Sequence, residues 1–138
     1  MEFEEDAKIQ QIADAYALDA VDFAKHSFSI TLDWSDRSVA KVEDILLEMY
    51  NQKKTAKPTE EVLWTFSKMF GSYIGEVFRR NHGATWGLVA MGDEKIPGLQ
   101  SKSCTLFWPW SRVSKRLTNG PEDNVWHYYQ ALLPEQSS

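Results

Sequence analysis

Residues that could do chemistry concentrate in the segment Gly71-Ser72-Tyr73-Ile74-Gly75-Glu76-Val77 and just after it. Glu76 falls at the border of an apolar helical stripe, where a carboxylate could bind a ligand or act as a general base. Arg80 follows four residues later, a spacing that equally suits a helix ion pair worth roughly 0.2–0.5 kcal/mol. Both interpretations of Glu76 stay open, and the ion pair is the simpler one.

A binding site in this region would use neighbouring side chains that can hydrogen-bond, stack or carry charge. The candidate binding residues are Tyr73, Glu76, Arg80, His82 and Trp86. Such a site predicts a concave, partly apolar pocket around Glu76. We assign no catalytic residue, no metal site and no cofactor, because the histidines and the single cysteine show no recognised nucleophile or ligand spacing.

The two glycines of the segment point to close packing. Gly71 and Gly75 are four residues apart, so they lie on one face of a helix. Each costs about 1 kcal/mol relative to alanine in mid-helix. We therefore expect another helix or the sheet to pack against their backbone, and a ligand or partner protein is the second interpretation.

Several motifs together resemble a family of small bacterial domains of unknown function. They are Asp33-Trp34-Ser35, the glycine segment 71–77, His82-Gly83-Ala84-Thr85-Trp86, and the stretch from Val113 to Asp123. The resemblance covers about residues 28–133. It implies a bacterial origin and one intact domain, and it supplies no catalytic residues.

The helices that carry these residues follow from apolar spacing of three and four residues. Helices are predicted at 4–25, 36–51, 58–81, 111–118 and 122–133, with a polar loop at 51–57. The helix 58–81 is apolar around much of its girth, through residues such as Val62, Phe66 and Phe70, so we expect it to be central. Gly83 is its expected C-terminal stop.

A small antiparallel sheet is predicted between the helices. Its strands are expected at 86–91, 96–99 and 104–108, with a turn at 92–95 and an extended segment or short strand at 28–32. Pro97 should confine 96–99 to an edge, and Cys104 should be a buried strand residue. The predicted class is α+β, with three N-terminal helices, the sheet and two C-terminal helices in a single domain over residues 1–138.

Length and composition agree with one intracellular domain. The chain has 138 residues and a net charge of −5, a size typical of a single domain. Cys104 is its only cysteine, so no internal disulfide can form. The acidic N-terminus does not resemble a signal peptide, and no apolar run approaches a membrane span. We predict a cytoplasmic protein that does not interact with membranes.

Charge is unevenly distributed along the chain. Residues 1–25 hold seven acids, whereas residues 95–121 hold five bases and no acid. Solvated faces are the simpler interpretation, and a protein partner is the second. Aromatic and basic residues alternate at Trp108, Trp110, Arg112, Lys115 and Arg116. Nucleic-acid binders carry a denser basic stripe, so we do not expect a nucleic-acid partner.

These observations favour a non-enzymatic protein-binding domain of the immunity or adaptor type. The grounds are small size, many aromatic residues, divided charge and no recognised catalytic set. The alternative is a small-molecule-binding domain or an enzyme whose site surrounds Glu76.

Overall fold

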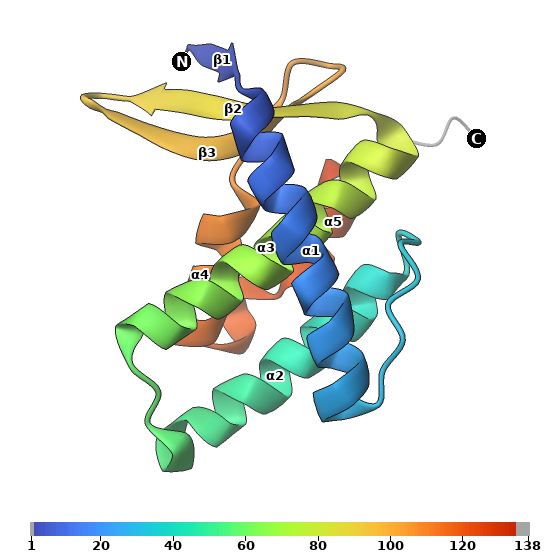
Figure 1. Ribbon diagram of the computed structural model, residues 1–138, viewed down its shortest axis with the longest axis vertical. Helices are drawn as coiled ribbons and strands as arrows, with labels where there is room; N and C mark the ends of the chain where they lie inside the picture. Colours follow the sequence, from blue (N-terminus) through green and yellow to red (C-terminus); the bar gives the residue numbers. More distant parts are fainter. Residues whose placement is uncertain (1, 135–138) are drawn as a thin grey trace.

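A computed structural model describes residues 2–134 as five α-helices and a four-stranded antiparallel sheet (Figure 1). The order is β1 (Phe3–Glu5), α1 (Ala7–Phe28), α2 (Ser38–Ala56), α3 (Glu60–His82), β2 (Ala84–Met91), β3 (Glu94–Ser101), β4 (Leu106–Phe107), α4 (Pro109–Asn119) and α5 (Val125–Leu132). A short 3-10 turn, Pro121–Asp123, joins α4 to α5. The predicted α+β class is confirmed.

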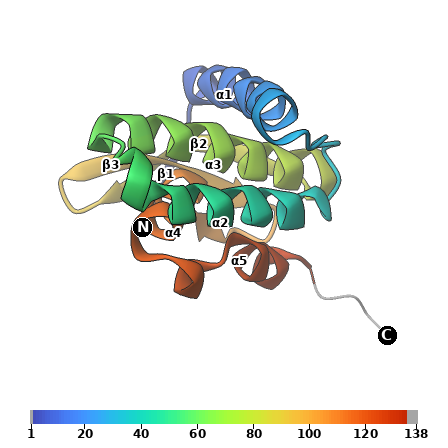
Figure 2. The ribbon, with the colours of Figure 1, turned by 90° about the horizontal axis from the view of Figure 1, so that it is seen from below.

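Helix α3 lies at the centre of the molecule, as its apolar girth predicted. Figure 2 shows α1 as the outermost layer on one side of α3, with α4 and α5 on the opposite side. Helix α1 approaches α3 through a stripe of fully buried alanines, Ala13, Ala17, Ala20 and Ala24. These small side chains allow the two helix axes to lie close together.

The glycines of α3 are points of tight packing, which confirms the packing interpretation. A Cβ atom at Gly71 would lie 2.7 Å from the Cα of Trp110 and 2.8 Å from the backbone of Pro109. A Cβ atom at Gly75 would lie 2.4 Å from the ring of Trp86 and 2.8 Å from Leu99. Gly71 therefore allows the start of α4 to pack closely against α3, and Gly75 allows the sheet to do so.

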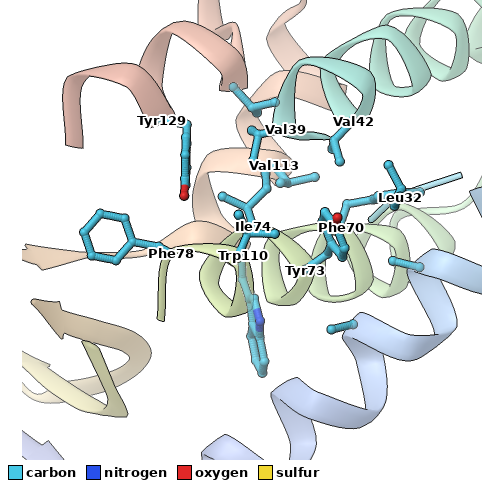
Figure 3. Close-up of a cluster of buried hydrophobic side chains, with 14 of the residues drawn as sticks. Leu32, Val39, Val42, Phe70, Tyr73, Ile74, Phe78, Trp110, Val113 and Tyr129 are labelled. Carbon is cyan, nitrogen blue, oxygen red and sulfur yellow. The ribbon is translucent and has the colours of Figure 1, made fainter. Parts of the chain in front are cut away.

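The hydrophobic core continues on the side of α3 that faces α2, α4 and α5 (Figure 3). Side chains of α3 meet side chains of α2, α4 and α5 there. The buried residues that Figure 3 labels are Leu32, Val39, Val42, Phe70, Tyr73, Ile74, Phe78, Trp110, Val113 and Tyr129.

The sheet has the strand order β1-β2-β3-β4. Strands β2 and β3 form a hairpin over their full length, and β1 pairs with β2 at Phe3↔Val89. Strand β4 pairs with β3 only at Leu99 and Gln100. At Pro97, β3 therefore has a neighbouring strand on one side only.

Several element boundaries differ from the prediction. Strand β3 begins at Glu94 inside the predicted turn, β4 is confined to Leu106–Phe107, and α5 begins at Val125 after the 3-10 turn. The predicted first helix began at residue 4, but Phe3–Glu5 forms a strand and the helix begins after its N-cap, Asp6. Helix α2 continues through the predicted loop to Ala56, because no residue there breaks a helix before Lys57-Pro58. Residues 29–33 are irregular, so the 28–32 segment is no strand.

The expectation for Pro97 was wrong in part, and the expectation for Cys104 was wrong. Strand β3 is a central strand, although the part that contains Pro97 is open on one side. Cys104 is exposed and adopts a left-handed conformation with φ 65° in the turn before β4. Its neighbours Leu106 and Phe107 form the strand, so the thiol lies outside the core.

Among residues 2–134, no helix combines the length and the apolar character that a membrane crossing requires.

Candidate functional site

Glu76 is the one carboxylate among the five predicted site residues. Its side chain is fully buried in α3. Arg79 donates from Nε to Oε2 at 2.7 Å and from Nη2 to Oε1 at 3.0 Å. Trp86 donates from its indole Nε1 to Oε2 at 2.9 Å. Glu76 thus joins the last turns of α3 to the first residues of β2.

The expected partner, Arg80, makes the longer contact of the two arginines around Glu76. Its Nε lies 3.6 Å from Oε1 of Glu76. Arg80 instead stacks on the indole of Trp34 at 3.8 Å and donates to Asp14 Oδ1 at 3.2 Å. The i,i+4 ion pair is present, but the bidentate i,i+3 pair with Arg79 is the closer one.

The pKa of Glu76 reflects two opposing effects. Burial acts to raise it, but the hydrogen bonds from Arg79 and Trp86, together with the nearby arginine charges, outweigh burial, so the pKa lies below its ordinary value. The carboxylate is therefore ionised at neutral pH and already accepts three donors. A general base needs a pKa near the working pH, and the environment of Glu76 shifts it the other way.

This lowered pKa predicts an acid-dependent contribution to stability. Glu76→Gln should reduce the free energy of unfolding at pH 7 by roughly 1–3 kcal/mol, because the buried partners lose a charged acceptor. A lowered folded-state pKa gives stability that is present above the unfolded pKa, about 4.5, and lost as the pH falls. The difference between wild type and Glu76→Gln should therefore shrink below pH 4.5 in urea titrations. Exposed Glu61→Gln is the control, and a difference that does not change with pH would contradict the prediction.

A polar cleft of about 370 Å³ lies beside this ion pair. Trp86 and Arg79 line one side, and Asp6, Gln10 and Asp14 line the other. Glu76 itself is not part of the lining. The cleft therefore opens next to Glu76, onto the arginine that Glu76 holds in place, and it is neither centred on Glu76 nor mainly apolar.

Tyr73 belongs to a second network, on the side of α3 that faces the 33–38 segment. Its hydroxyl accepts the backbone N–H of Trp34 at 2.9 Å and lies 2.6 Å from Ser38 Oγ. Ser38 Oγ bonds to the carbonyl of Ser35, so Tyr73 is the donor to Ser38. Burial raises the pKa of Tyr73, which keeps the phenol protonated.

His82 joins the same side of the molecule through Asp36. The Nε2 of His82 lies 2.8 Å from Oδ2 of Asp36, and the hydroxyl of Tyr129 donates to Oδ1. Asn81 Nδ2 is 3.4 Å from the same oxygen. No local sequence pattern links Asp36 to Tyr129, which is 93 residues away.

The five predicted residues thus form two networks rather than one site. Glu76 and Trp86 bond to each other, whereas Tyr73 and His82 bond to the 34–38 segment. Arg80 stands between them, with contacts to Glu76 and Trp34. In this arrangement the polar residues of α3 hold β2, α1 and the 34–38 segment in position.

An apolar groove opens where the last turns of α1 and α2 meet the first turns of α3. Its volume is about 340 Å³. The residues that define it here are Phe23, Phe28, Met49, Ala56, Val62 and Phe66. Phe23 forms its aromatic floor, with ring centroids 4.9 Å from Phe66 and 5.8 Å from Phe28. Val62 remains 42% exposed at the edge.

The sequence contained a partial signal for this groove. Val62 and Phe66 share the apolar stripe of α3, which the pattern assigned to the interior. The last two turns of α2, which supply Ala56, were predicted to be a loop. Because α2 extends beside α3, the stripe borders a groove instead of a closed core.

No protein-family model, curated protein or solved structure matches this chain. The resemblance to a bacterial domain family stays a prediction.

Proposed function

We propose that the protein is a non-enzymatic protein-binding domain, and that the apolar groove is where its partner docks. The observation that carries the proposal is an aromatic-floored groove left open to solvent between three helix ends. Surface apolar clusters rimmed by polar residues are typical of protein interaction sites. Val62 and the nearby Trp64 are each 42% exposed, although both are large apolar residues.

The form of the groove favours a helical partner segment. Three helices line it, and a volume of about 340 Å³ accommodates two or three apolar side chains. An amphipathic helix presents such side chains at positions i, i+3 or i+4, and i+7, and inserts them into a groove of this kind. The partner segment is therefore an amphipathic helix whose apolar face covers Val62 and Phe66.

The bonding of the polar residues supports binding over catalysis. Glu76 is held as an anion by Arg79 and Trp86, and Asp36 is held by His82 and Tyr129. Each carboxylate is used to connect elements of the fold. The exposed apolar surface of the groove, by contrast, does not connect elements of the fold.

Site-specific photo-crosslinking tests this function in cells that produce the protein. A photoreactive residue at Val62 should capture a discrete partner, whereas the same residue at Gln130, an exposed position on α5, should not. A second experiment, an affinity pull-down without crosslinking, compares wild type with Val62→Glu and with the control Gln130→Glu, which adds the same charge elsewhere. Loss of the captured protein with Val62→Glu alone supports the groove. Equal recovery with both variants, or no capture at Val62, would refute it.

A further inference from the structure

A third cavity lies between the sheet and the C-terminal helices. Its volume is about 460 Å³. Ile96 and Leu106 line it from β3 and β4, and Tyr128 lines it from α5. Trp108 and Lys115 also line it. We call it the aromatic–basic pocket, and it shares no lining residue with the apolar groove.

The first turns of α4 bring three polar side chains to this pocket. Ser111, Arg112 and Lys115 are at positions i, i+1 and i+4, so one face of the helix presents them together. The first helical bond runs from the N–H of Arg112 to the carbonyl of Trp108 at 3.1 Å. The N–H of Ser111 precedes this bond, and such N–H groups at a helix start favour anions.

The positive charges of the 95–121 segment are mostly neutralised, and Lys115 is the exception at this pocket. Arg112 pairs with Asp123 at 3.1 Å and lies 4.5 Å above the ring of Tyr128. Arg116 is fully buried against Glu43, so it faces the interior. Within residues 2–134 no carboxylate pairs with Lys115, which is exposed at the edge of the pocket.

The remaining walls are aromatic and neutral. Burial raises the pKa of Tyr128 to about 12, so its phenol carries no charge at neutral pH. Trp108 borders the cavity, and the neighbouring Trp110 is turned inward, where its Nε1 donates to Ser72 at 2.8 Å. The alternating aromatic and basic residues therefore divide between the core and this pocket.

We infer that the aromatic–basic pocket binds a small monoanion with a flat apolar body, of the aromatic carboxylate class. The apolar body would lie among Ile96, Leu106 and Tyr128, and the carboxylate would meet Lys115 and the N–H of Ser111. A volume of about 460 Å³ is in the range of small-molecule sites. One unpaired cation balances one negative charge, whereas a dianion would leave a second charge desolvated without a partner.

Calorimetric titration of the full chain with 2-naphthoate and with 2-naphthamide tests this inference. The two probes share a ring system and differ in charge. Naphthoate should bind at least about fivefold more tightly than the amide, because it alone forms charge-assisted hydrogen bonds. Lys115→Gln should weaken naphthoate binding by roughly five- to tenfold. It should leave the affinity for the amide unchanged, and Lys115→Arg should largely restore naphthoate binding.

Lys25→Gln, an exposed lysine at the end of α1, is the matched charge control and should bind naphthoate as wild type does. Equal affinity for the two probes would overturn recognition of the anion. An unchanged affinity in Lys115→Gln, or no binding at millimolar probe, would overturn the site itself. Neither result would affect the apolar groove, because the two sites share no residue.

Discussion

Replacing Glu43 by leucine is expected to lower the free energy of unfolding by about 3–5 kcal/mol, because it leaves a buried charge without a partner. Arg116 has no exposed side-chain surface and donates to both carboxylate oxygens of Glu43, at 2.8–3.0 Å. Glu43 also accepts the backbone N–H of Val125 at 3.0 Å. One carboxylate therefore connects α2 to α4 and to the start of α5.

Urea unfolding of three variants distinguishes the cost of the unpaired charge from the loss of a side chain. Glu48→Leu, an exposed position on the same helix, should change stability by no more than about 0.5 kcal/mol. The double variant Glu43→Leu with Arg116→Met should recover much of the loss, since an apolar pair of similar volume needs no charge partner. If Glu43→Leu and Glu48→Leu were equally mild, the buried pair would contribute nothing to stability.

The second large effect is expected at Gly71. Alanine there would place a Cβ atom 2.7 Å from the Cα of Trp110, closer than real Cβ contacts. The clash is with backbone, so α4 itself must shift, and we expect a loss of about 1–3 kcal/mol. In an open helix the same substitution would stabilise by about 1 kcal/mol, so the sign of the change decides between packing and exposure.

Thermal and urea unfolding of Gly71→Ala and Gly75→Leu measure the change in the free energy of unfolding. Gly75→Leu should also destabilise by about 1–3 kcal/mol, because its side chain would overlap the indole of Trp86. Ala15→Gly on the exposed face of α1 calibrates helix propensity alone, with an expected cost of about 1 kcal/mol. A stabilised Gly71→Ala variant would mean that α4 does not pack on this glycine.

Local sequence patterns predicted helices and strands well where residues within the element itself determine its structure. The apolar spacing of α1 and α3 and the stop at Gly83 depend on residues within a few turns. One error occurred where a distant segment decides the structure. Phe3–Glu5 looks like the start of a helix, but pairing with residues 87–89 makes it a strand.

The candidate site shows the same division. Glu76 was recognised because its position on the wheel and its spacing from Arg80 are local properties. Its partner Trp86 became clear only when α3 and β2 were placed together. Arg79 is on the same helix, at an i,i+3 spacing that the prediction passed over in favour of Arg80. The pair of Glu43 and Arg116 spans 73 residues, so no periodicity in the sequence connects its two members.

The arrangement of the sheet has a consequence for self-association. An exposed strand edge with unpaired N–H and C=O groups can recruit the edge of a second molecule and start a growing aggregate. Here one outer strand is Phe3–Glu5, which is short and carries two carboxylates. On the other side, β4 covers only Leu99 and Gln100, and the uncovered part of β3 contains Pro97, which has no N–H to donate. Both edges therefore discourage the addition of further strands, and the sheet is protected against polymerising at high concentration.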